Sequence, residues 1–134
     1  MKTHSAETLL SIWLDPSDLA QYRQLLEFLH TVPPRLDAPE RNAYVKQNLL
    51  LQEWTSFIKF QLNYALSQLK SDLYNLASQL QDELKAEKIK SAEERNRALH
   101  GDPRYRRQAL EVEQLGLVVT RINDLEWILK GAVK

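Results

Sequence analysis

Residues 95 to 108 read RNRALHGDPRYRRQ and place five arginines around a Gly-Asp-Pro sequence. The wider window from Lys85 to Arg107 holds eight basic and four acidic residues, although the whole chain has 18 of each sign. Guanidinium groups bind phosphate oxygens through two parallel hydrogen bonds, and an aromatic ring among them can stack on an unpaired base. The window therefore predicts a surface that binds a nucleic-acid backbone. The candidate residues are Lys85, Lys88, Lys90, Arg95, Arg97, Arg104, Tyr105, Arg106 and Arg107.

A solvated charged helix tip is the alternative interpretation of the same window, because exposed helices often carry Lys and Arg interspersed with Glu. The chain has no net charge, so no overall field draws it to DNA or to an acidic membrane. Any anion site must come from local clustering, and both interpretations stay open.

Other kinds of chemistry find little support in the residue types. The chain has no cysteine, which excludes disulfides, thiolate metal ligands and cysteine nucleophiles. His4, His30 and His100 each lack a second histidine at helical spacing, so we expect no metal site and no cofactor. Three glycines build neither a nucleophile elbow nor a glycine-rich phosphate loop. We therefore expect a protein that is not an enzyme.

The elements that must carry the basic window are helices, because residues with small helix penalties dominate the composition. At 134 residues the chain has the size of one domain. Asp15 followed by Pro16 predicts the start of a helix that ends near His30. We predict a single all-α domain over 1–134, with an N-terminal helical segment (1–31), a proline-rich linker (32–39) and a long helical hairpin (40–134).

The stretch from Glu40 to about His100 contains neither proline nor glycine and would span about 90 Å as one helix. Such a length exceeds a compact domain of this size. Either the helix breaks near Lys85 to Lys90, where the apolar pattern fades, or it protrudes and finds partners.

The Gly-Asp-Pro sequence at 101–103 predicts a turn between two helices. Its glycine can end a helix in the left-handed conformation, its aspartate can cap the next helix, and its proline suits the first helical position. The second arm then runs to about Lys130. We expect residues 115–129 of this arm to pack antiparallel on residues 73–89, so that the arm covers about half of the long helix.

Apolar residues recur at spacings of three and four along the long helix, as in a coiled-coil seam. Further apolar residues widen this seam, so that it needs more than one neighbour. Its aromatic half must meet the N-terminal helix or other subunits. We expect a homo-oligomer whose interface contains Leu51, Trp54, Phe57, Ile58, Leu62, Leu66, Leu69 and Leu73.

The apolar stretch before Asp15 is too short for a signal segment or a membrane span. We therefore expect a cytoplasmic protein with no membrane partner.

Two stretches of the chain, AYVKQNLLLQEWTSFIKFQLNYAL and RNRALHGDPRYRRQALEVEQLGLVVTRINDLEWILKGAV, resemble the UvsY-type recombination mediators of bacteriophages. Those proteins have a long central helix with an early tryptophan, and a later basic and acidic turn that leads into an amphipathic helix. The resemblance covers about residues 42 to 131. The matching features are Tyr44, Asn48, Trp54, Lys59, Arg97, Ala98, Asp102, Tyr105, Leu115, Ile122, Leu125 and Ile128.

The resemblance implies a homo-oligomer that binds single-stranded DNA, contacts the single-strand-binding protein and the recombinase, and loads the recombinase without hydrolysing nucleotide. It also implies the cytoplasm of a bacterial host cell, if the chain is encoded by a phage. The residues themselves leave an alternative open. The same hairpin suits a non-enzymatic phage interaction protein, either an assembly factor or an inhibitor of a host protein, that does not bind DNA.

Overall fold

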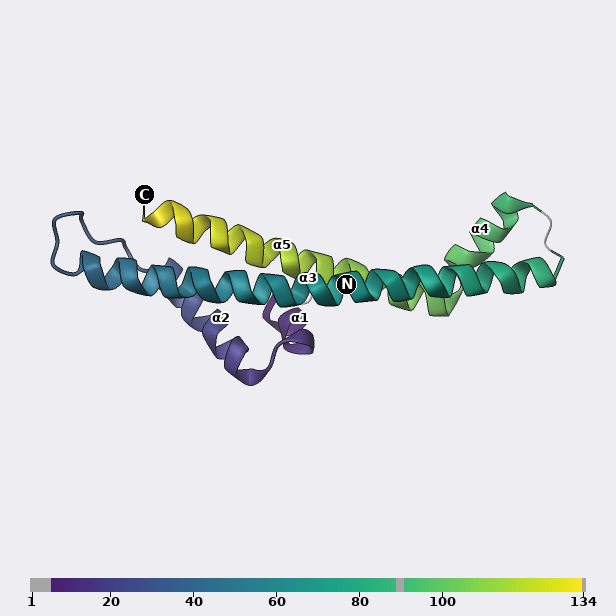
Figure 1. The fold of residues 1–134 in the computed structure, drawn as a ribbon, viewed down its shortest axis with the longest axis horizontal. Helices are drawn as coiled ribbons and strands as arrows, with labels where there is room; N and C mark the ends of the chain where they lie inside the picture. Colours follow the sequence, from purple (N-terminus) through teal and green to yellow (C-terminus); the bar gives the residue numbers. More distant parts are fainter. Residues whose placement is uncertain (1–5, 89–90, 134) are drawn as a thin grey trace. The chain divides into compact units, whose positions relative to one another are not determined.

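The computed structural model describes residues 6–88 and 91–133, which form five helices and no strand. Figure 1 shows them coloured from the N-terminus to the C-terminus. The expected all-α fold with a long central helix is confirmed. The helices are α1 (Ala6–Trp13), α2 (Pro16–Leu29), α3 (Arg41–Ala86), α4 (Ala92–Gly101) and α5 (Pro103–Ala132).

The start of α2 lies where the sequence predicts it. The Asp15 side chain accepts a hydrogen bond of 2.8 Å from the backbone N–H of Asp18, and Pro16 is the first helical residue. Proline is tolerated there because its missing N–H would have no partner within the helix. His30 is the C-cap, as expected.

The long helix breaks rather than continuing to His100. Helix α3 ends at Ala86, and the only positive φ of a non-glycine residue in the described chain is that of Lys88, at 63°. Ser91 then caps α4, because its side chain accepts a hydrogen bond from the backbone N–H of Glu94. Of the two alternatives for this stretch, the break near Lys85 to Lys90 is confirmed.

The turn at 101–103 follows the prediction in part. The Asp102 carboxylate caps α5 by accepting a hydrogen bond of 2.8 Å from the N–H of Arg104, and Pro103 is the first residue of α5. The left-handed conformation predicted at Gly101 is wrong, since Gly101 ends α4 with an ordinary negative φ. A left-handed conformation is found instead at Lys88, two residues after the end of α3.

The chain divides into two compact units. The first unit is Met1–Leu62 with Leu117–Lys134, and the second is Asn63–Gly116. In the first unit the C-terminal part of α5 lies beside the N-terminal part of α3 (Figure 1). Its buried side chains include Leu10, Tyr22, Leu25, Leu51, Ile58, Leu62, Ile122, Leu125 and Leu129; those of the second unit are Leu80, Leu99 and Leu115.

The pairing register of α5 differs from the prediction. Asn48 Nδ2 donates a hydrogen bond of 2.9 Å to the carbonyl of Leu129, and Lys59 Nζ lies 2.7 Å from Glu126 Oε1. Residues 126–129 therefore pair with residues 48–59, whereas the prediction placed residues 115–129 on residues 73–89. The prediction assumed that α3 continues to the turn at 101–103, whereas α3 ends at Ala86. The second arm consequently pairs with residues much earlier in α3.

No helix in the described ranges is long and apolar enough to cross a membrane.

Candidate functional site

The basic residues predicted to bind an anion lie in the second unit, on the segments around α4. Lys85 is near the end of α3, Arg95 and Arg97 lie on α4, and Arg104 is the second residue of α5. Lys85 and Lys88 are exposed, and Arg95 is half-buried. Lys90 lies outside the described residues. The remaining candidates, Tyr105, Arg106 and Arg107, follow Arg104 on α5.

Two of these arginines are neutralised by carboxylates. Arg104 Nη2 lies 3.0 Å from Asp102 Oδ2 and 3.4 Å from Glu83 Oε2. The hydrogen bond with Asp102 raises the pKa of Arg104, and the side-chain and backbone bonds from Arg104 lower the pKa of Asp102. Arg97 Nη2 is 3.4 Å from Glu93 Oε1 on the exposed surface of α4. These two side chains thus have carboxylate partners within the protein.

Arg106 and Arg107 differ from them. Both are exposed, and neither guanidinium forms an ion pair with any residue in the described part of the chain. Both line an open groove with a volume of about 640 Å³. The other lining residues are His100, Pro103, Tyr105, Ala109, Leu110 and Glu113. The groove thus offers two cations that are available to an external anion.

The local sequence positions this groove at the junction of α4 and α5. The cap and the proline fix where α5 begins, and helical spacing then places Pro103, Arg106, Arg107 and Leu110 along one face. The ring of His100 is the contribution of α4, with Nδ1 2.8 Å from the carbonyl oxygen of Asn96. This ring packs edge-on against that of Tyr105, with 5.2 Å between centroids. Aromatic edges, an apolar wall and two free cations therefore meet in one place.

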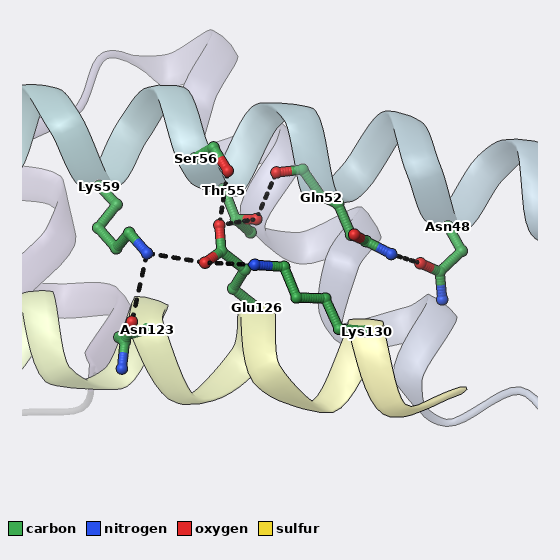
Figure 2. A network of polar contacts seen from close by, with 8 residues as sticks. All are labelled: Asn48, Gln52, Thr55, Ser56, Lys59, Asn123, Glu126 and Lys130. Carbon is green, nitrogen blue, oxygen red and sulfur yellow. Dashed lines mark hydrogen bonds and ion pairs between the residues drawn. The ribbon is translucent and has the colours of Figure 1, made fainter. Parts of the chain in front are cut away.

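A second polar site, in the first unit, was not predicted from the sequence. Glu126 of α5 is 4% exposed, and its carboxylate lies among polar side chains of α3 (Figure 2). Lys59 Nζ is 2.7 Å from Oε1, and the Ser56 hydroxyl donates a bond of 2.7 Å to Oε2. Thr55 Oγ1 lies 3.4 Å from Oε2, and Lys130 Nζ lies 3.4 Å from Oε1. The carboxylate is thus surrounded by donors.

The protonation of Glu126 reflects this environment. Burial opposes ionisation, but the hydrogen bonds from Lys59 and Ser56 and the positive charges of Lys59 and Lys130 outweigh it. Together they lower the pKa of Glu126 from 4.5 to about 2. The side chain is therefore ionised at neutral pH.

The polar contacts continue along the same seam toward Asn48. Asn48 and Thr55 have no exposed surface, and Gln52 Nε2 donates a bond of 2.6 Å to Asn48 Oδ1 (Figure 2). Every buried side-chain nitrogen and oxygen of the described residues has a hydrogen-bond partner. Polar residues at core positions of paired helices fix the register, since other registers leave them unsatisfied. The sequence contains one signal of this polar seam: Asn48 and Thr55 lie one heptad apart among the apolar residues of the long helix.

The residues predicted to form a subunit interface differ in how far they are buried. Leu51, Ile58 and Leu62 are buried in the core of the chain itself, which leaves them no surface for a second subunit. Trp54 is half-buried, and its Nε1 donates a hydrogen bond of 3.2 Å to Asp18 of α2. Phe57 is 58% exposed. The last three predicted interface residues belong to the second unit and are also half-buried: Leu66, Leu69 and Leu73.

Metal coordination has no candidate in the described ranges, since no three His, Asp or Glu side chains there form a group that could hold an ion.

Comparison with models of known families, with curated proteins and with solved structures gives no match.

Proposed function

We propose that this protein is a non-enzymatic recombination mediator that binds single-stranded DNA as a homo-oligomer and helps to load a recombinase. The observation that supports DNA binding is the pair Arg106 and Arg107, which are exposed, form no ion pair with any described residue, and line a groove that also holds Tyr105. Contacts with a recombinase and with a single-strand-binding protein are proposed from the resemblance to UvsY-type mediators.

Single strands suit this groove better than duplex DNA. The His100 and Tyr105 rings and the exposed side chain of Leu110 offer surfaces on which unpaired bases can stack, whereas bases in a duplex are already stacked. Two arginines neutralise few phosphates. A homo-oligomer that presents several copies of the groove to one strand would raise the affinity through a high effective concentration.

Self-association has its own support in the first unit. Phe57 and Phe60 lie on the side of α3 that faces away from the buried residues Thr55 and Ile58, and they are 58% and 73% exposed. Two neighbouring phenylalanines with this exposure form an apolar surface of the kind that binds another protein chain. We propose that a second copy of the chain covers it.

The test of DNA binding uses a double substitution. Arg106→Ala with Arg107→Ala is expected to weaken binding of a fluorescent single strand, measured by anisotropy, at least tenfold and to flatten its salt dependence. The matched control is Lys70→Ala with Arg121→Ala, which removes two exposed charges outside the groove. The groove is not the binding site if the control variant weakens binding as strongly as the double arginine substitution does. The same conclusion follows if the affinity of the unmutated protein for the single strand does not fall between about 50 and 200 mM salt.

A helical interaction protein that does not bind DNA is the second candidate. The exposed Phe57 and Phe60 favour it, because an apolar surface fits a protein partner and contributes nothing to phosphate binding. Complete absence of binding of single-stranded DNA by the unmutated protein would favour this candidate over the mediator.

A further inference from the structure

The groove at the junction of α4 and α5 has opposite charges at its two ends. Arg106 lies in the first turn of α5, and Glu113 lies seven residues later on the same helix, about 10 Å along its axis. Glu113 is exposed, and its carboxylate forms no ion pair with any described residue. A groove that served phosphates alone would gain nothing from this carboxylate.

The polarity of the groove determines how a nucleotide can lie in it. Phosphate is attracted to Arg106 and Arg107 and repelled by Glu113, so the base is the part that reaches the carboxylate. Ala109 and Leu110 form the apolar wall between the two ends, and Leu110 is 52% exposed. Such a wall suits the flat face of a base.

A carboxylate at the far end selects among bases, because it accepts hydrogen bonds and donates none. Guanine presents N1–H and an N2 amino group side by side on its Watson–Crick edge, which match the two oxygens of one carboxylate. Thymine presents a single N–H between two carbonyl oxygens, and these oxygens repel the carboxylate. Only an unpaired base exposes this edge to protein.

We propose that the groove holds one unpaired guanine, with its phosphate at Arg106 and Arg107, its base on the apolar wall and its Watson–Crick edge on Glu113. The proposal rests on the single-strand binding proposed above. It adds a base preference and assigns Glu113 as the residue that determines it.

The experiment compares three labelled strands of about 15 nucleotides. One is all thymidine, one carries three separated guanines, and one carries inosine at the same three positions. The guanine strand is expected to bind at least fivefold more tightly than the thymidine strand, the lower end of what a bidentate base contact provides. Inosine lacks the N2 amino group and is expected to lose most of this preference.

Substitution of Glu113 tests the assignment of the residue. Glu113→Gln is expected to bind the thymidine strand more tightly than the unmutated protein does, because a negative charge is removed from the groove. It is also expected to lose the preference for guanine, since an amide has only one acceptor oxygen. The matched control is Glu111→Gln, an exposed neighbour on α5 that does not line the groove, which is expected to keep the preference.

Two different results would overturn the inference. If the protein binds all three strands equally, or if Glu113→Gln keeps the guanine preference, the base contact is refuted while single-strand binding stands. If the protein binds none of the strands, the proposed function fails and the inference fails with it.

Discussion

Glu126 shows how one buried carboxylate is made compatible with a helical core. Its exposed fraction is 4%, and removal of an ion from water is costly unless partners replace the water. Lys59, Ser56 and Lys130 supply those partners, and they lower its pKa to about 2. Because the pKa is depressed in the folded protein, the stability from this group is present above pH 4.5 and is lost as the pH falls toward 2.

Glu126→Gln is therefore expected to lower the free energy of unfolding at pH 7 and to reduce its dependence on pH. The loss should be at most about 3 kcal/mol, because one pKa unit corresponds to about 1.4 kcal/mol. Urea unfolding at pH 7 and at pH 2.5 measures both quantities. At pH 2.5, well below 4.5 and close to 2, most of the stabilisation from this carboxylate has already been lost, so the difference between the two proteins should shrink.

The control for this prediction is Asp124→Asn, which neutralises an exposed carboxylate two residues away on α5. It should change the unfolding free energy by less than about 0.5 kcal/mol, as surface substitutions usually do. A Glu126→Gln protein that keeps the full pH dependence of the unmutated chain would contradict the role assigned to this network.

At the scale of elements, the end of α3 depends on a lysine in an unfavourable conformation. Lys88 has a φ of 63°, in a region that costs non-glycine residues about 1–2 kcal/mol. The backbone N–H of Lys88 still bonds to the carbonyl of Lys85, 3.0 Å away, so the helix ends in an ordered turn. Glycine is the residue that usually occupies such a position.

Lys88→Gly is accordingly expected to raise the free energy of unfolding by up to about 1 kcal/mol, because it relieves this strain. Lys88→Val is expected to lower it, since a β-branched residue tolerates positive φ poorly. Urea unfolding monitored by circular dichroism measures both changes. Glu87→Gly, at the preceding residue, should not stabilise the protein; a gain equal to that of Lys88→Gly would argue against the left-handed turn.

At the scale of the whole molecule, the exposed phenylalanines of α3 predict self-association. The molar mass from light scattering should exceed the 15.6 kDa of one chain, and it should fall when Phe57 and Phe60 are both replaced by serine. The cause is the loss of apolar surface that a second copy would bury. A single-chain mass for the unmutated protein would contradict the proposal.

The matched control replaces two exposed apolar residues of the linker. Val32 and Leu36 are 84% and 82% exposed, so Val32→Ser with Leu36→Ser removes comparable surface away from α3. This variant should keep the molar mass of the unmutated protein. Equal dissociation by both variants would mean that general apolar exposure, and not the α3 surface, drives association.

The sequence by itself determined which segments are helical. Signals of this kind are local: Asp15 and Pro16 begin α2, Asp102 and Pro103 begin α5, and each acts through the backbone within a few residues. The break after α3 had a local signal too, because Ser91 and Glu94 have the spacing of a capping box. The basic residues of the groove were likewise visible as a cluster around 101–103.

Only the tertiary structure decided how the helices pair and which charges stay available. Apolar residues at spacings of three and four permit several registers of α5 on α3. The observed register is the one in which Asn48 and Glu126 find partners across the seam. The same holds for the arginines: Arg104 meets Glu83, 21 residues away in the chain, while Arg106 and Arg107 meet no carboxylate among the described residues. Partners far apart in sequence are chosen by packing and desolvation, and no local pattern contains that information.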